Sequence, residues 1–489
     1  MEYYEHALAV LGLGPSNPHQ HAELLLALGQ TQCWAGAVDD AIATLERTFE
    51  LTRAHGNYDL FCQAILLWFQ LRRESAVLDS VFHARINEAL QHVVEKNTTF
   101  AQLQVARAMA LVLTAPASER VAWVQEALAL SQGIANRRAR LDVLRGALRC
   151  ATRFTDGTTG LALAGEMLEL ADSLQSPENE LEARQWKVFY LLEQGNGDEF
   201  ARQVLDYAQR AAVFQTPLAS WTANMHRVGQ LFLSGDLAEC ERLTREAGDS
   251  GEKLVGVVGV LHLVGQLFQI GVELTGTDAE RVLGDAQTAA RQILVMAPKY
   301  HVLLTIFHRA AMHRGQPRDA QQYLSAMLSP GYVPPDPLDQ HSLCALVNIA
   351  DMAAELGHTE AAAIALQLLE PHSGLHAVSA TGGAYYGSAS YWRGRLCLTL
   401  GRRAEAAEHL ERALRASRQV GSVTFRAWSE YYLAQARESD AHTQRVLLES
   451  SRRAAERHGM TRLLAKLHID GGNGVDFHAS SGEHSGSSY

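Results

Sequence analysis

The sequence lacks most of the features that point to a particular chemistry. Its six cysteines lie far apart and never form a C-x-x-C pair, so neither a disulfide framework nor a zinc-binding cysteine motif is indicated. No G-x-x-x-x-G-K-[ST] sequence is present, which excludes a phosphate-binding loop of that kind. Only 12 of the 489 residues are proline, and no stretch shows sustained alternation of polar and apolar residues. These absences leave a helical chain without a recognisable catalytic motif.

The chain also lacks an excess of positive charge. It has 54 acidic and 43 basic residues, so no global field attracts nucleic acid or anionic lipid, and we expect no direct binding to either. Glu2 and Glu5 stand near the N-terminus, where a secretory signal needs basic residues. We therefore expect a cytoplasmic protein.

One apolar stretch resembles a membrane span. Residues 254–272 carry no formal charge and are nearly long enough to cross a bilayer. The stretch nevertheless contains four glycines together with His262, Gln266 and Gln269. We predict a helix buried between neighbouring helices, and no membrane association.

Glycine and alanine recur at fixed distances along a chain rich in helix-forming residues. Near the N-terminus, Gly29 is followed seven residues later by Gly36, and then by Ala41, Leu45 and Thr48. The same distances separate a second set of residues near the C-terminus: Gly394, Gly401, Ala406, Leu410 and Ala413. This spacing predicts a helical hairpin, in which the first glycine allows close packing, the second makes the turn, and the leucine fills the gap.

The pentapeptide VGQLF occurs twice, at 228–232 and at 264–268. It places Gly229 and Gly265 inside apolar helical runs. A glycine in a helix interior costs about 1 kcal/mol relative to alanine, so its recurrence predicts close approach by another helix.

The glycine and alanine spacings resemble those of tetratricopeptide repeats. Small residues that match Ala406 recur along the second half of the chain at steps of 39, 41, 42 and 44 residues: Cys240, Ala279, Ala320, Ala362 and Ala406. The sequence predicts an all-α fold, a right-handed α-solenoid of roughly ten or eleven tetratricopeptide-like hairpins with a concave face free to bind a ligand. HEAT-type repeats have a similar period and remain the structural alternative.

Two passages interrupt the helical pattern, and a third ends it. Residues 328–341 contain four prolines and predict an extended connection between a solenoid at 1–327 and further repeats at 342–468. Residues 370–388 form a second non-helical passage, and we expect a hinge or subdomain boundary at one of the two. The Gly/Ser-rich residues 469–489 predict a disordered tail.

A cluster of arginines is the strongest candidate binding surface in the sequence. Residues 136–154 contain six arginines and one acid, and on a helix Arg138, Arg145 and Arg149 lie on one face. Guanidinium groups arranged in this way suit carboxylates or phosphates, although a solvated outer face is the simpler interpretation. These three arginines are the predicted partner-binding residues.

No residue is assigned to catalysis, to a cofactor or to a metal. His372 and His376 have the i, i+4 spacing of a helical metal site, but Pro371 and Gly374 argue against a helix there. We therefore expect a protein that is not an enzyme and needs no cofactor.

The last hundred residues resemble the MalT-like repeat region at the C-terminus of large bacterial signalling ATPases. These include LuxR-type and BTAD-type transcription regulators, and nucleotide cyclases fused to an ATPase and tetratricopeptides. The matching residues lie between 365 and 467, and each is a packing residue: Pro371, Gly374, Gly387, Ser388, Leu400, Gly401, Arg402, Glu405, Ala406, His409, Leu410, Glu411, Ala413, Leu414, Gly421, Gly459 and Met460.

The resemblance implies a scaffold or sensor in a signalling or transcription-regulatory system. Its partner would be a protein, such as an ATPase, a cyclase or a transcription factor, or else a small effector bound in the concave groove. The alternative is that the chain is the regulatory C-terminal part of an ATP-dependent cyclase or ATPase-coupled regulator, whose catalytic domains are missing from it.

Overall fold

The computed structural model describes most of the 489-residue chain. The described residues are 2–11, 17–72, 80–93, 95–111, 115–133, 136–150, 158–296, 301–329, 342–437 and 440–472.

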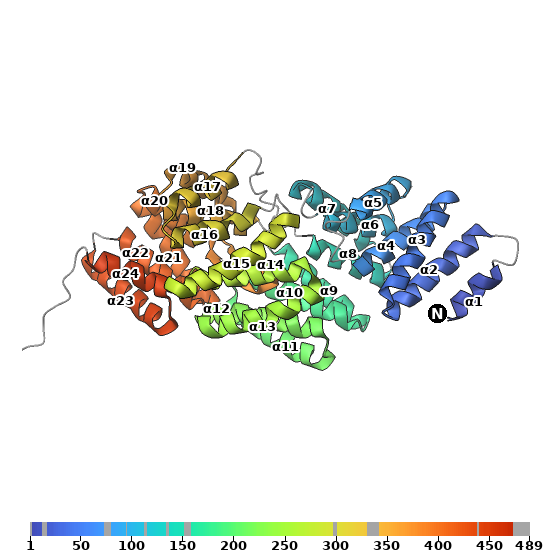
Figure 1. Ribbon diagram of the computed structural model, residues 1–489, viewed down its shortest axis with the longest axis horizontal. Coiled ribbons are helices and arrows are strands. Elements are labelled where there is room, and N and C mark those ends of the chain that lie inside the picture. Colours follow the sequence, from blue (N-terminus) through green and yellow to red (C-terminus); the bar gives the residue numbers. More distant parts are fainter. Residues whose placement is uncertain are drawn as a thin grey trace, which may run out of the picture.

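The described residues form 24 α-helices and one pair of strands (Figure 1). The first twelve helices are α1 (Glu2–Leu11), α2 (Pro18–Trp34), α3 (Val38–Ala54), α4 (Tyr58–Arg72), α5 (Ser80–His92), α6 (Thr98–Ala110), α7 (Ala117–Gln132), α8 (Arg137–Arg149), α9 (Thr159–Ser173), α10 (Pro177–Glu193), α11 (Gly197–Phe214) and α12 (Pro217–Ser234). The remaining helices are α13 (Leu237–Val255), α14 (Val257–Gly271), α15 (Gly276–Met296), α16 (Leu304–His313), α17 (Pro317–Met327), α18 (Ser342–Leu356), α19 (Thr359–Leu368), α20 (Ala389–Thr399), α21 (Arg403–Val420), α22 (Val423–Ala436), α23 (Ala441–His458) and α24 (Thr461–Gly472).

The helices pack as consecutive antiparallel pairs. Between α1 and α24, the described residues form eleven such pairs, from α2–α3 to α22–α23, stacked along the molecule (Figure 1). Most of the even-numbered helices contact the next even-numbered helix along the chain, and together they form the inner face of the stack. The predicted all-α solenoid of helical hairpins is therefore confirmed.

The recurring glycines explain how the two helices of a pair approach each other closely. A Cβ atom on Gly29 would lie 3.2 Å from Leu45 Cδ2, and one on Gly394 would lie 2.6 Å from Leu410 Cγ. The turn glycine of the first pair, Gly36, has φ 74°, a left-handed conformation that side chains disfavour. Both predicted roles, close packing and turning, are confirmed.

The C-terminal part of the stack curls back on itself. Helix α12 contacts α22, and α11 contacts α21, so segments far apart in sequence become neighbours. The Thr424 hydroxyl donates to the Phe232 carbonyl at 3.2 Å, across 192 residues of chain. The Arg462 amide donates to the Glu273 carbonyl at 3.0 Å, which ties α24 to the end of α14. Helices α10 to α24 therefore form a closed turn.

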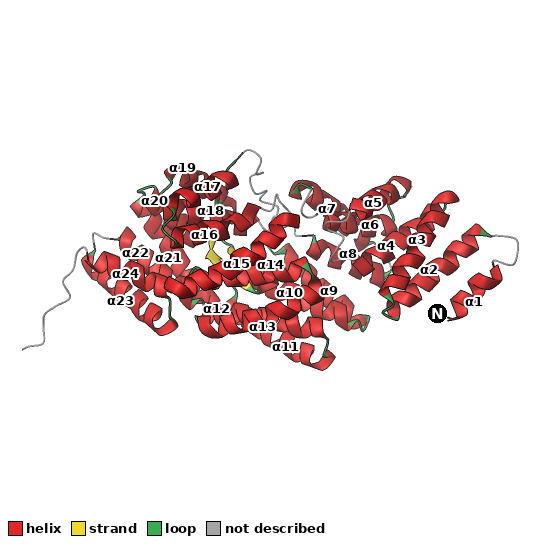
Figure 2. Cartoon of the chain, viewed as in Figure 1, coloured by secondary structure: helices red, strands yellow, loops and turns green. Residues whose placement is uncertain are grey.

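A β-hairpin fills the inside of this closed turn. Strands β1 (His376–Ser379) and β2 (Ala384–Ser388) pair antiparallel, with a register irregularity between His376 and Val378. In Figure 2 the two strands lie among the surrounding helices. The passage 370–388 is non-helical apart from 3-10 turns, as predicted, and most of its residues are buried. The hinge or subdomain boundary expected at this passage or at 328–341 stays a prediction.

The apolar stretch at 254–272 is divided between two helices. Helix α13 ends at Val255, and Gly256, with φ 58°, separates it from α14. Most of the α14 side chains are buried against neighbouring elements, as predicted. Within the described residues, no helix is both long and apolar enough to span a membrane.

The predicted connection and the predicted tail lie mainly outside the described residues. Residues 330–341 lie outside the described residues, and so does most of the predicted tail, 473–489. Helix α24 continues to Gly472, a few residues into the segment predicted as tail.

Replacing Gly394 with alanine tests the packing role of the template glycine. The new methyl group would press on Leu410, and overpacking of this kind costs about 1–3 kcal/mol, partly offset by alanine's higher helix propensity. We expect a lower melting temperature in a circular dichroism melt. Gly165→Ala in α9 is the matched control, because a Cβ there meets no atom within 4 Å, and it should raise stability slightly. Equal effects of the two changes would contradict the packing role.

Candidate functional site

The hairpin sits against inner-face helices at the two glycines of the repeated pentapeptide. A Cβ atom on Gly229 of α12 would overlap the carbonyl oxygen of Gly382, at the tip of the hairpin. One on Gly265 of α14 would lie 3.1 Å from Tyr386 Oη. The expectation that another helix approaches these glycines is wrong, because the approaching element is the hairpin.

Two glutamines on α14 hold the hairpin backbone. The Gln269 side chain accepts a hydrogen bond from the Tyr385 amide at 2.8 Å and donates to the Gly383 carbonyl at 3.3 Å. Gln266 donates to the same carbonyl at 3.1 Å. Both glutamines are fully buried, so these bonds satisfy backbone groups that water cannot reach.

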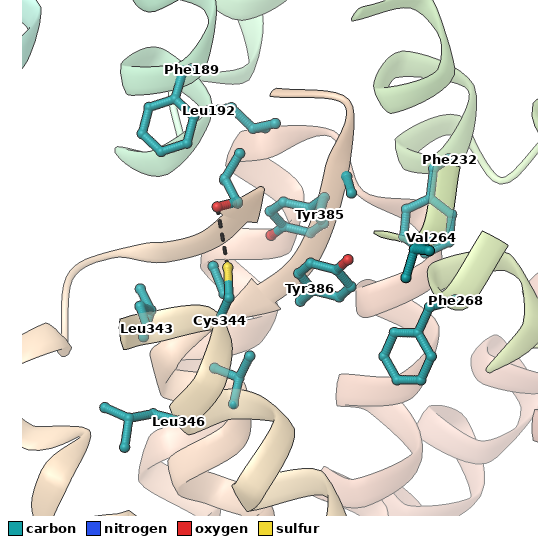
Figure 3. Close-up of a cluster of buried hydrophobic side chains, with 14 of the residues drawn as sticks. Phe189, Leu192, Phe232, Val264, Phe268, Leu343, Cys344, Leu346, Tyr385 and Tyr386 are labelled. Carbon is teal, nitrogen blue, oxygen red and sulfur yellow. Dashed lines mark hydrogen bonds between the residues drawn. The ribbon is translucent and has the colours of Figure 1, made fainter. Parts of the chain in front are cut away.

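Apolar side chains complete the seat of the hairpin. Figure 3 shows Tyr385 and Tyr386 among Phe232, Val264 and Phe268, contributed by α12 and α14. On the other side, the Cys344 thiol of α18 lies 3.2 Å from the Val378 carbonyl. Tyr385 is 1% exposed, so the hairpin belongs to the core of the closed turn.

A network of buried charges lies beside the hairpin. Arg309 of α16 and Arg395 of α20 both bind Asp351 of α18, the latter at 2.6 Å. Glu355, one turn further along α18, lies 2.9 Å from Arg395 Nη2 and 3.5 Å from Arg309 Nη1. Burial acts to raise the pKa of Asp351, but the surrounding arginines lower it to about 2. The network therefore holds its acids ionised and links three successive inner helices.

The last helix adds two more basic groups to this network. Arg462 Nη2 lies 2.8 Å from Glu355 Oε1, and Lys466 Nζ lies 3.7 Å from the same oxygen. Arg462 Nη1 donates to the Val272 carbonyl at 3.1 Å. The charges therefore join α24 to α14 and α18.

Glu273 follows α14 and faces the same region. Its carboxylate accepts a hydrogen bond from Trp428 Nε1 at 2.8 Å. Burial raises the pKa of Glu273 to about 7, against the opposing effects of this bond and of Arg462 and Arg309. Glu273 is therefore the titratable acid of the closed turn near neutral pH.

A cavity of about 40 Å³ lies between the charge network and the hairpin. Nine of its sixteen lining residues are aromatic, and four are charged. The charged lining residues are Asp351, Glu273, Arg395 and Arg462. Arg395 also lies over the Tyr432 ring at 4.7 Å, and Arg462 over the Trp428 ring at 5.2 Å. Arginine side chains stacked on aromatic rings therefore form part of the cavity wall.

The predicted arginine stripe lies elsewhere, on the inner face of the N-terminal repeats. Arg138 is exposed at the start of α8, whereas Arg145 and Arg149 are partly buried. Arg145 lies 3.1 Å from Asp142, and Arg149 pairs with Glu182 of α10. The three arginines share a helix face, as expected, but two of them have acidic partners within the chain. Their binding role stays a prediction.

The charge network was not predicted from the sequence, although the regular spacing of its residues can be seen there. Arg309, Asp351 and Arg395 each stand eleven residues before the small residue of the next helix, which is Ala320, Ala362 or Ala406. Charged residues at an equivalent inner-face position of three consecutive repeats were the available signal. Comparing equivalent positions between repeats would have found them.

His372 and His376, which were considered for a metal site, do not share a helix. His372 lies in a 3-10 turn and His376 in β1. No group of three potential metal ligands occurs among the residues that the structure describes.

Comparison with known proteins gives matches only at the level of structure. No protein-family model matches the chain, and no curated protein matches its sequence. The chain is similar to a Rap protein complexed with Competence and Sporulation Factor, with a TM-score of 0.50 and 12% identity over 82% of this chain and 98% of that one. It is also similar to the Cut9–Hcn1 hetero-tetramer of the APC/C, with a TM-score of 0.45 and 14% identity over 95% of this chain and 92% of that one. A human IFIT1 dimer with m7Gppp-AAAA is similar with a TM-score of 0.43 and 10% identity over 89% of this chain and 90% of that one.

The fold is therefore an α-solenoid of helical hairpins of the tetratricopeptide type.

The raised pKa of Glu273 predicts a pH-dependent effect of Glu273→Gln. A folded-state pKa above the unfolded value contributes stability that is present below about 4.5 and lost as pH rises through about 7. The variant has no such loss, so its melting temperature relative to the wild type should rise between pH 5 and pH 8. A difference that does not change with pH would contradict the assignment.

Buried His226 predicts loss of stability in acid. It lies on α12, with its ring 4.8 Å from the Tyr207 ring, and burial lowers its pKa to about 3. A lowered pKa contributes stability that is present above about 6.5 and lost as pH falls toward 3, or about 2 kcal/mol by pH 5. His226→Phe should reduce the fall in melting temperature between pH 7.5 and pH 5. His55→Phe, at an exposed position, is the control and should leave that fall unchanged.

Proposed function

We propose that the protein is a non-enzymatic interaction scaffold of a bacterial signalling or transcription-regulatory system. The resemblance of residues 365–467 to the repeat region of signalling ATPases supports this setting. The Rap protein of similar fold is complexed with a separate factor, which supports a scaffold that recognises a protein or peptide. The partner segment would bind on the inner face of the N-terminal repeats.

The observation that carries this proposal is the division of the inner face into two parts. In the closed turn, the inner face of α10, α12, α14 and α18 is covered by the chain's own hairpin. The inner helices α2, α4, α6 and α8 lie apart from that hairpin, toward the N-terminal end of the molecule (Figure 1). A partner segment would therefore bind along these N-terminal helices.

Polar side chains run across three of the neighbouring inner helices. Gln102 of α6 donates to Asp142 of α8 at 3.1 Å, and Arg145 of α8 lies 3.4 Å from Asn179 of α10. Next to them, Arg149 pairs with Glu182. A partner with acidic side chains would compete with Asp142 and Glu182 for these guanidinium groups, so we propose an acidic protein segment as the ligand.

A charge-swapped variant tests this site without breaking the fold. Arg149→Glu combined with Glu182→Arg keeps an ion pair between α8 and α10 but exchanges the positions of its charges. Combined with Arg138→Glu, it should weaken binding of a partner isolated from the native host about tenfold or more, as measured by calorimetry. The melting temperature should stay within about 2 °C, because the exchanged pair keeps opposite charges in contact between α8 and α10.

Arg137→Glu is the matched control, since Arg137 is also exposed at the start of α8 but lies outside the stripe. It should leave the affinity within about twofold of the wild type. Wild-type affinity of the stripe variant, or an equal loss in both variants, would contradict the proposed site.

A further inference from the structure

The hairpin shows how an inner helix of this stack holds an extended backbone. Gln269 of α14 accepts a hydrogen bond from the Tyr385 amide and donates to the Gly383 carbonyl, and Gln266 donates to the same carbonyl. One turn earlier on α14, His262 Nε2 lies 3.1 Å from the Thr381 hydroxyl. A carboxamide can donate and accept, so it can pair with backbone groups whatever side chains the strand carries.

Helix α4 carries glutamines at matching positions. Gln70 is the third residue from the end of α4, and Gln269 is the third from the end of α14. Gln63 precedes Gln70 by seven residues, as His262 precedes Gln269, so each pair lies two turns apart on one helix face. The glutamines of α4 therefore occupy positions equivalent to those that hold the hairpin.

This face of α4 is open to solvent. Helix α4 contacts α2, α3, α5 and α6, which leave one side uncovered. On that side Gln63 and Gln70 are exposed, and Leu66 and Leu67 between them are partly exposed, whereas the other residues from 60 to 69 are buried. The face combines carboxamides with an apolar strip, as the inner face of α14 does, and so suits a strand with its alternating side chains.

Helix α2 continues the same surface. Gln30 stands eleven residues before Ala41, which is the inner-face position already seen in the charge network, and its side chain is exposed. Trp34 lies one turn further along α2 and is 76% exposed. An indole ring open to solvent at the end of an inner face favours contact with a partner.

The charges of this surface determine where an acidic segment can lie on it. Glu23 and Asp59 are exposed, seven residues before Gln30 and four before Gln63, and therefore share the faces of these glutamines. They repel acidic side chains from α2 and α4. The acidic residues of a segment would therefore meet the arginines of α8, and its uncharged residues would cross α2 and α4.

From these observations we infer that the inner face of α2 and α4 binds the partner segment in an extended conformation, through hydrogen bonds from Gln30, Gln63 and Gln70 to its backbone. The inference rests on the proposed function, because the acidic end of the same segment lies on α8. Inner helices about 8–10 Å apart give a span of roughly 30 Å from α2 to α8, which about nine extended residues cross at about 3.3 Å each.

Two fluorescent peptides of twelve residues test this recognition on the full chain. Each alternates threonine with serine in one half and threonine with glutamate in the other, and the acidic half comes first in one peptide and last in the other. At least one should bind with a saturable rise in anisotropy. N-methylation of the amides in the neutral half removes hydrogen-bond donors but keeps every side chain, and should weaken binding about tenfold or more.

Glutamine variants identify the groups that hold the backbone. Gln63→Ala combined with Gln70→Ala should weaken binding of the unmodified peptide by a similar factor, and N-methylation should then have almost no further effect. Both side chains are exposed, so the melting temperature should stay unchanged. Gln321→Ala combined with Gln322→Ala, at exposed positions of the outer helix α17, is the matched control and should bind like the wild type.

The outcomes separate this inference from the proposed function. No binding of either peptide, equal binding of the methylated forms, or full binding by the α4 glutamine variant would overturn the inference. If the stripe variant loses affinity for the peptides and the glutamine variant does not, the acidic site on α8 stands and backbone recognition is wrong. The reverse result would support backbone recognition and contradict the acidic site.

Discussion

The closed turn depends on the contact between the hairpin and two helices that lack side chains at the point of contact. Gly229 and Gly265 allow the hairpin backbone to approach α12 and α14 closely, and Gln269 supplies the hydrogen bonds that its buried backbone needs. A hairpin of two short strands is at best marginally stable alone in water. Here the helices provide its stability, and in turn the hairpin fills the space that a closed superhelical turn would otherwise leave empty.

The charge network has a consequence for how rigid this turn is. Buried ion pairs contribute little net stability compared with apolar packing, but losing one partner leaves an uncompensated charge at a cost of about 3–5 kcal/mol. Asp351 joins α16 to α20, and Glu355 extends the network to Arg462 of α24. The inner helices of these repeats therefore cannot slide past one another independently, unlike repeats joined by apolar contacts alone. This argues that α16 to α24 move as one unit.

Local packing was predictable from the sequence, whereas contacts across the superhelix were not. The Gly29–Leu45 and Gly394–Leu410 contacts lie within single hairpins, so their spacing alone identified them. Gly229 was recognised as a close-packing position, but its partner, Gly382, lies about 150 residues away, and no local pattern indicates a strand there. The arginine stripe was placed on one helix face correctly, yet its acidic neighbour Glu182 belongs to another repeat. The cavity is lined by residues of six helices and of the hairpin, and it depends on the curvature of the stack, which repeat spacing does not determine.

Closure of the turn also makes the N-terminal repeats and the closed turn different in flexibility. In a repeat stack each unit contacts mainly its neighbours, so small changes of angle add up along the chain and an inner face can adapt to a partner. Closure of the turn removes that freedom from α10 to α24, since α12 and α22 are fixed to each other. The N-terminal repeats keep it, and Arg138, Arg145 and Arg149 lie on their inner face. The inner face that can adapt its shape is therefore that of the N-terminal repeats, whereas the closed turn keeps a fixed shape.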